Sequence, residues 1–134
     1  MSGIVCTNLK VAPGQRISVK GDIPAGAKSF AVNLGKTKDE VGLHLNPRFD
    51  AHGDINTIVC NSKNKGQWGT EHRETNFPFQ AGSNTEVSFS HDKKEFTITL
   101  PGNYQFKFPY TLGADTIEYL CVEGDFVFKG VSLS

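Results

Sequence analysis

The stretch "VGLHLNPRF" covers residues 41–49 and alternates apolar and polar side chains. Successive side chains of a β-strand point to opposite faces, so this alternation predicts a strand with one buried face. The core face would carry Val41, Leu43, Leu45, Pro47 and Phe49. The other face would carry Gly42, His44, Asn46 and Arg48, with neighbouring side chains about 6–7 Å apart. The stretch therefore predicts a strand packed on a core, with a row of hydrogen-bonding groups outside it.

Similar short runs occur along the whole chain, separated by turn residues such as Pro13-Gly14 and Pro101-Gly102. They cover residues 16–22, 29–35, 55–62, 68–74, 86–92, 95–102, 104–109 and 116–133. No segment shows a sustained helical period. About ten or eleven strands without long helices predict an all-β fold, a jelly-roll sandwich of two antiparallel sheets.

Length and charge narrow the function classes. The chain has 134 residues, which favours a single domain over residues 1–134. Its 14 Lys and Arg residues balance 14 Asp and Glu residues, so the formal net charge is zero. Nucleic-acid binding usually needs a basic excess, so no nucleic-acid partner is expected. Without an apolar run of about 18 residues, no membrane insertion is expected either.

The first residues and the cysteines bear on the compartment. The start "MSGIVCTNLKVAPG" has no basic segment followed by an apolar one, so no secretory signal peptide is expected. The cysteines are three and widely spaced: Cys6, Cys60 and Cys121. This pattern favours free thiols in a reducing cytosol over a disulfide framework or a zinc site, with Cys60 in the core.

Polar groups of the neighbouring runs extend the row on residues 41–49. In residues 55–62, Ile58 and Cys60 would face the core, while Asn61 would face outward with Thr57 and Val59. In residues 68–74, Glu71 and Arg73 share a face and Trp68 begins the run. The connecting loop adds His52 and Asp54. The predicted cluster comprises His44, Asn46, Arg48, His52, Asp54, Asn61, Trp68, Glu71 and Arg73.

Two enzymatic interpretations of this cluster are open. His52 and Asp54 match the start of a two-histidine, one-carboxylate metal site, with His72 or His91 as the second histidine. His72 should point away from Glu71 and Arg73, however, and His91 is expected in a solvated hairpin turn. Alternatively, Asp54 and Glu71 could be the acid–base pair of a glycosidase. Nearby arginines would lower the pKa of both carboxyls, whereas a general acid needs its pKa raised.

A carbohydrate-binding site accounts for the whole cluster. Sugars present hydroxyls that both donate and accept hydrogen bonds, together with patches of C–H. Planar polar side chains can hold two hydroxyls each, and an aromatic ring can cover the C–H patch. Such a site needs no catalytic residue, metal or cofactor.

The segments "HLNPRF", "HGD", "NTIVCNSK", "WGTEHRE" and "FPFQ" together resemble the galectins, the β-galactoside-binding lectins. The resemblance extends over essentially the whole chain and is nearest to the single-domain prototype group. It implies a jelly-roll sandwich with the sugar on the concave face. One departure is Tyr110, which follows "FKFP" where galectins usually have Asn.

The resemblance also implies a role for each site residue. His44, Asn46 and Arg48 would bind the axial 4-hydroxyl of galactose, and Asn61 and Glu71 its 6-hydroxyl. Trp68 would stack on the galactose ring. Arg48 and Glu71 would reach the neighbouring glucose or N-acetylglucosamine, near which His52 would lie. Asp54 and Arg73 would hold Arg48 and Glu71 in place.

Prototype galectins form two-fold dimers through their terminal strands, so a homodimer that crosslinks glycoconjugates is expected. The terminal runs 3–9 and 126–133 are apolar and would form open sheet edges. Val5 and Val131 are the predicted contacts between protomers. The resemblance further implies synthesis in the cytoplasm and export to the extracellular space without a signal peptide.

Overall fold

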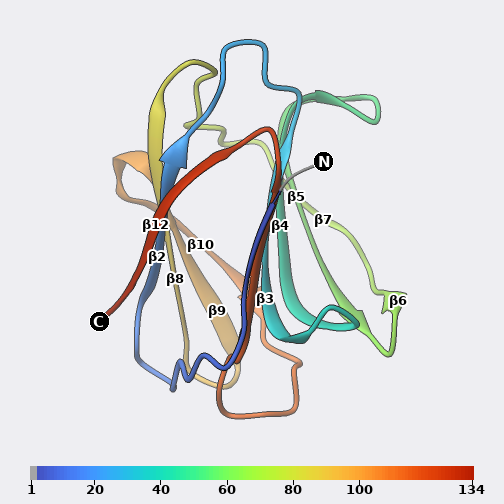
Figure 1. Ribbon diagram of the computed structural model, residues 1–134. Coiled ribbons are helices and arrows are strands. Elements are labelled where there is room, and N and C mark those ends of the chain that lie inside the picture. Colours follow the sequence, from blue (N-terminus) through green and yellow to red (C-terminus); the bar gives the residue numbers. More distant parts are fainter. Residues whose placement is uncertain (1–2) are drawn as a thin grey trace.

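The computed structural model describes residues 3–134 as two antiparallel sheets stacked face to face (Figure 1). The first sheet has seven strands, in the order β1-β11-β3-β4-β5-β6, with β7 also paired to β5. Its strands are β1 (Gly3–Cys6), β3 (Phe30–Thr37), β4 (Glu40–Ala51), β5 (Asp54–Asn64), β6 (Gln67–Trp68), β7 (His72–Glu74) and β11 (Tyr119–Gly124).

The second sheet has five strands, in the order β10-β9-β8-β2-β12. They are β2 (Ile17–Asp22), β8 (Asn84–His91), β9 (Glu95–Leu100), β10 (Tyr104–Pro109) and β12 (Val127–Leu133), with a 3-10 turn at Pro101–Asn103. The predicted all-β jelly-roll sandwich is confirmed, with twelve strands in the described part of the chain rather than ten or eleven. No helix among residues 3–134 is long and apolar enough to cross a membrane.

The core lies between the sheets and is built by the alternation seen in the sequence. On β4, Val41, Leu43 and Leu45 are buried, and on β5 Ile58 and Cys60 are buried, as predicted. Gly42 is the exception to the predicted outer face. The β4–β5 register shifts between Val41 and His44, and a Cβ on Gly42 would lie 3.3 Å from the Phe96 ring. Gly42 therefore faces the interior, where a larger side chain would collide with a core aromatic.

The sandwich has two open sides, and the terminal strands form one of them. At the other side, the Tyr104 hydroxyl of β10 donates to Glu74 Oε1 of β7 over 2.8 Å, which joins the two sheets. The remaining edge strands, β1 and β12, therefore share the opposite side. On it, Val5 is 58% exposed, whereas Val131 is half-buried and packs against the core.

Residues 68–74 do not form one continuous strand. Trp68 pairs with Lys63 of β5, but His72 pairs with Cys60. Three residues separate Trp68 from His72, whereas two separate Cys60 from Lys63, so the segment has one residue more than β5 can pair with. The Gly69 amide donates to the Ser62 carbonyl over 2.8 Å at the break. The interruption leaves Glu71 between β6 and β7.

The prediction of a solvated His91 is wrong. The turn begins one residue later, at Asp92, whose carboxylate accepts from the amides of Lys94 and Glu95. His91 ends β8, is 2% exposed, and stacks on Tyr110 with ring centroids 4.2 Å apart. The aromatic side chain at position 110 thus gives the imidazole a buried surface that residue-by-residue alternation does not predict.

Candidate functional site

A hollow of about 580 Å³ lies on the outer face of the seven-stranded sheet. Strands β3, β4, β5 and β11 form its floor, and the segment from Trp68 to Glu71 forms a wall. Seven residues of the predicted cluster line it, namely His44, Asn46, Arg48, His52, Asn61, Trp68 and Glu71. The other two, Asp54 and Arg73, do not line it but contact residues that do.

The β4 row is held by hydrogen bonds. Asn46 is nearly buried, and its Nδ2 donates to the Phe30 carbonyl over 2.7 Å. Arg48 Nε donates to Asn46 Oδ1 over 2.9 Å. These bonds fix both side chains before any ligand arrives, which lowers the entropy lost on binding.

A chain of ion pairs continues from Arg48 across the wall of the hollow. Arg48 Nη1 lies 2.7 Å from Asp54 Oδ2, and Arg73 Nη2 lies 3.1 Å from the same oxygen. Arg73 Nη1 then donates to Glu71 Oε1 over 2.9 Å. Asp54 therefore links the two arginines, and Arg73 orients Glu71.

The same ion pairs oppose acid–base catalysis. Hydrogen bonds from Arg73 and Arg48 hold the pKa of the Asp54 carboxyl below its usual range. A general acid needs a raised pKa, so Asp54 stays ionised when it would have to donate a proton. The geometry makes this carboxylate a brace for two arginines.

The predicted metal ligands are not brought together. His52 occupies the turn between β4 and β5, while His72 Nε2 lies 3.2 Å from Glu74 on β7 and His91 ends β8 in the other sheet. No group of three or more His, Cys, Asp or Glu side chains within residues 3–134 could hold a metal ion.

The position of His52 follows from its turn. His52 and Gly53 both have positive φ, 52° and 83°, as a two-residue type I′ hairpin requires. This turn matches the twist of β4 and β5. It brings His52 to the lining of the hollow at the end of β4.

Trp68 and Asn61 complete the side of the hollow next to β6. The indole is 50% exposed, with the His44 ring edge-on at 4.8 Å and Lys63 Nζ 4.6 Å from its centroid. Asn61 is buried, and its Oδ1 accepts from the Ser62 amide over 2.8 Å. Its amide N–H groups make no hydrogen bond to residues 3–134 and can serve a ligand.

Sequence reasoning missed residues on β3 and β11. Ala31 and Glu123 also line the hollow, with Ser29 just before β3. Asn33 lies behind His44, and its Oδ1 is 2.6 Å from His44 Nδ1. The alternation in residues 29–35 could have found Ser29, Ala31 and Asn33, because all three share the outer face of that run.

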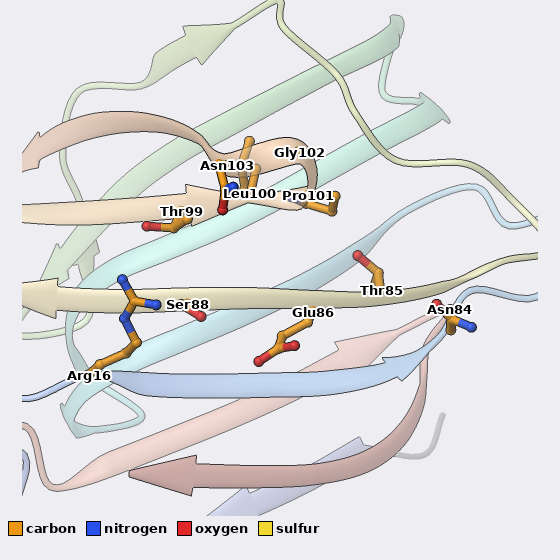
Figure 2. A pocket seen from close by; sticks show the side chains of 10 residues that line it. All are labelled: Arg16, Asn84, Thr85, Glu86, Ser88, Thr99, Leu100, Pro101, Gly102 and Asn103. Carbon is orange, nitrogen blue, oxygen red and sulfur yellow. The ribbon is translucent and has the colours of Figure 1, made fainter. Parts of the chain in front are cut away.

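A second hollow lies on the five-stranded sheet and has a different lining (Figure 2). It measures about 330 Å³ and is bounded by β8, β9 and the turn at Pro101–Asn103. Thr85 and Glu86 leave β8 on opposite sides, and Arg16 reaches in from the start of β2. Its lining includes hydroxyl, amide and long charged side chains without an aromatic ring.

Known proteins resemble this chain over nearly its full length. Residues 3–133 match the family model described as galactoside-binding lectin. A beta-galactoside-binding lectin of Gallus gallus is 55% identical over 130 residues, 97% of this chain and 96% of that protein. Galectin-1 of Mus musculus is 52% identical over the same shares of the two chains.

Solved structures agree with the sequence matches. CG-16, a homodimeric agglutinin from chicken liver, superposes with a TM-score of 0.95 at 49% identity, covering 99% of this chain and 100% of its own. A toad ovary galectin in complex with thio-digalactose has a TM-score of 0.95 at 40% identity, covering 100% of this chain and 99% of its own.

Proposed function

The chain belongs to the galactoside-binding lectins, and we propose that it binds β-galactosides such as lactose and N-acetyllactosamine in the hollow of the seven-stranded sheet. It is a binding protein rather than an enzyme. The observation that carries the proposal is the fixed row of His44, Asn46 and Arg48 beside a half-exposed Trp68. Binding would need neither metal nor cofactor, because side chains supply every contact.

The β4 row would recognise the axial 4-hydroxyl of galactose. A hydroxyl can donate one hydrogen bond and accept two. Arg48 has free N–H groups and only donates, Asn46 retains one free N–H, and a neutral His44 can accept. An axial hydroxyl between the three would satisfy its donor and both lone pairs.

The remaining contacts would surround this hydroxyl. Asn61 and Glu71 would hold the 6-hydroxyl, and Trp68 would cover the C–H face of the galactose ring. Burying roughly 40–50 Å² of sugar there contributes about 1 kcal/mol. Arg48, Glu71 and His52 would meet the second sugar.

Affinity for one disaccharide should be modest. The hydrogen bonds replace bonds to water and contribute a net ~0.5–1.5 kcal/mol each. After the cost of association, a dissociation constant on the order of 10⁻³–10⁻⁵ M is expected.

Titration calorimetry with lactose and maltose, each with and without EDTA, tests the proposal. Lactose should bind and maltose should not, because an equatorial 4-hydroxyl leaves the β4 row unpaired at a cost of at least ~1–3 kcal/mol. Equal affinities would refute galactoside recognition. Loss of lactose binding in EDTA would instead support a metal site.

We further propose that the protein acts as a two-fold homodimer. CG-16 is described as homodimeric, and here β1 and β12 offer two open edges on one side of the sandwich. Contacts through Val5 and Val131 would pair identical surfaces and leave the two hollows free. Weak sites joined in pairs could then crosslink glycoconjugates by multivalency.

The double substitution Val5→Asp/Val131→Asp tests this assembly. It should give a monomer by sedimentation that binds lactose normally and fails to agglutinate red cells, because it buries unpaired charges at the contact. A wild-type protein that is already monomeric at micromolar concentration would contradict the dimer.

Cytoplasmic synthesis followed by export without a signal peptide completes the proposal. Cys6, Cys60 and Cys121 are all free thiols, which suits a reducing compartment. Export from cells should continue when traffic through the endoplasmic reticulum and Golgi is blocked. Export that stops under this block would contradict the route.

A further inference from the structure

Asn33 lies in the middle of the seven-stranded sheet, beside the hollow. It lies on β3, paired with Cys121 of β11 on one side and with His44 of β4 on the other. The side chain is only 5% exposed, so its amide must satisfy its hydrogen bonds within the protein. Its contacts are therefore informative about the groups they orient.

The partners of Asn33 determine which way the amide points. Its Nδ2 lies 3.0 Å from Glu123 Oε2 and 3.4 Å from the Cys121 carbonyl oxygen. A carboxylate and a carbonyl can only accept hydrogen bonds, so the NH₂ group must face them. The amide oxygen is thereby turned toward the imidazole, with Oδ1 2.6 Å from His44 Nδ1.

This orientation assigns the proton on His44. An amide oxygen accepts and cannot donate, so Nδ1 must carry the hydrogen of that short bond. In a neutral imidazole the other nitrogen, Nε2, is then bare and can accept. The Glu123 carboxylate and the Cys121 carbonyl therefore orient Asn33, and Asn33 in turn makes His44 Nε2 an acceptor.

We propose that Asn33 is a positioning residue for sugar binding, which holds His44 as the Nδ1–H tautomer so that Nε2 accepts a hydrogen bond from the galactose 4-hydroxyl. This inference rests on the proposed function. Arg48 cannot accept, so the hydroxyl donates its hydrogen bond to His44 Nε2, while Arg48 and Asn46 donate to its lone pairs. The row would then be specific for a group that donates and accepts at once.

The surroundings of His44 keep the ring neutral. Burial lowers its pKa to about 4 and outweighs the opposing charge of Glu123 on β11. Arg48 on β4 and Lys63 on β5 lower the pKa further, while Glu71 in the wall raises it. A protonated ring would donate from both nitrogens, so neutrality is a condition for Nε2 to accept.

Nitrogen NMR of the wild-type protein tests the tautomer directly. Long-range ¹H–¹⁵N spectra of the free protein at neutral pH should show His44 with a protonated Nδ1 and a bare Nε2, and the Nε2 resonance should move when lactose is added. A protonated Nε2 in the free protein would overturn the proposal. Because the tautomer is read without ligand, it can fail while lactose binding stands, and lactose binding can fail while the tautomer stands.

A variant pair tests the positioning role through a pH profile. Asn33→Asp places a negative charge against Nδ1 and should raise the His44 pKa, while Glu123→Gln removes the carboxylate that would repel the new one. Between about pH 8 and about pH 5.5, lactose affinity should fall at least ~5-fold in the double variant as the ring becomes protonated. In Glu123→Gln alone it should change less than ~2-fold over that range, because Asn33 still holds a neutral ring.

Parallel pH profiles in the two variants would overturn the proposal, because a purely structural loss would not depend on protonation. Thermal unfolding of both variants checks that they fold. If the double variant does not fold, the wild-type tautomer still decides the question.

Discussion

Each sheet carries a hollow lined by polar side chains, and the two hollows differ in how firmly these side chains are held. Both are lined by polar side chains on outer strand faces. In the seven-stranded sheet Asn46 and Arg48 are largely buried and locked, Asn46 to the Phe30 carbonyl and Arg48 to Asn46 and Asp54. In the five-stranded sheet Ser88 is buried and bonded to Ser18, but the charged Arg16 and Glu86 are exposed and form no ion pair within residues 3–134. Preorganisation, rather than polarity, distinguishes a recognition site from an ordinary wet surface.

Arginine substitutions on the two faces should give the largest contrast. Arg48→Ala removes a donor to the 4-hydroxyl, its bond to Asn46 and its ion pair with Asp54. Lactose affinity should fall by about 100-fold or more by calorimetry, a loss of about 3 kcal/mol. The matched control Arg16→Ala lies at the other hollow and should bind lactose as wild type. An equal loss of lactose affinity in both variants would mean that the preorganised hollow is not the sugar-binding site.

The exposed aromatic side chain is the next test. Trp68→Ala should weaken lactose binding more than ~10-fold while the fold stays intact, because the half-exposed ring serves the ligand rather than the core. Val127→Ala is the control, since Val127 is 48% exposed on β12 of the other sheet. Fluorescence of the wild type should also shift with lactose, because Trp68 is the only tryptophan. If Trp68→Ala binds lactose as tightly as the wild type does, Trp68 does not contact the sugar.

Protonation of the half-buried His44 should make the protein less stable in acid. Unfolded His44 would have its ordinary pKa of about 6.5, whereas burial lowers the folded pKa to about 4. Between these values the unfolded chain takes up a proton that the folded chain does not, so stability falls as pH drops and levels off below about 4.

Denaturant unfolding of the free protein should show this fall as on the order of 1 kcal/mol between pH 7 and pH 5. Burial also lowers the pKa of His91 in the other sheet, so His91 adds to the loss of stability in acid. His44→Gln should remove only the His44 part of the slope. An unchanged slope in that variant would show that His44 protonates freely in the folded state.

The contrast also explains what the sequence could and could not reveal. Alternation located the core and the outward β4 row, because one buried face of a strand fixes its whole register. It could not reveal that Gly42 faces inward or that residues 68–74 break, since a register shift depends on the partner strand. Alternation places Asn33 on the outer face of its run, but the role of Asn33 depends on contacts with β11, 88 residues away in the chain. His91 was misplaced because Tyr110, from another strand end, provides its cover.

Thr85 should give the smallest effect and the most direct test of the second hollow. Its Oγ1 is buried and makes no hydrogen bond to residues 3–134, and the side chain lies beneath the turn at Pro101–Asn103 (Figure 2). Thr85→Val keeps the shape and removes that hydroxyl, so stability in urea should stay within ~0.5 kcal/mol of wild type or rise slightly. Lactose affinity should not change. A loss of more than ~1 kcal/mol in the free energy of unfolding would mean that the Thr85 hydroxyl has a hydrogen-bond partner in solution. The hollow of the five-stranded sheet would then be preorganised like the one that we propose binds sugar.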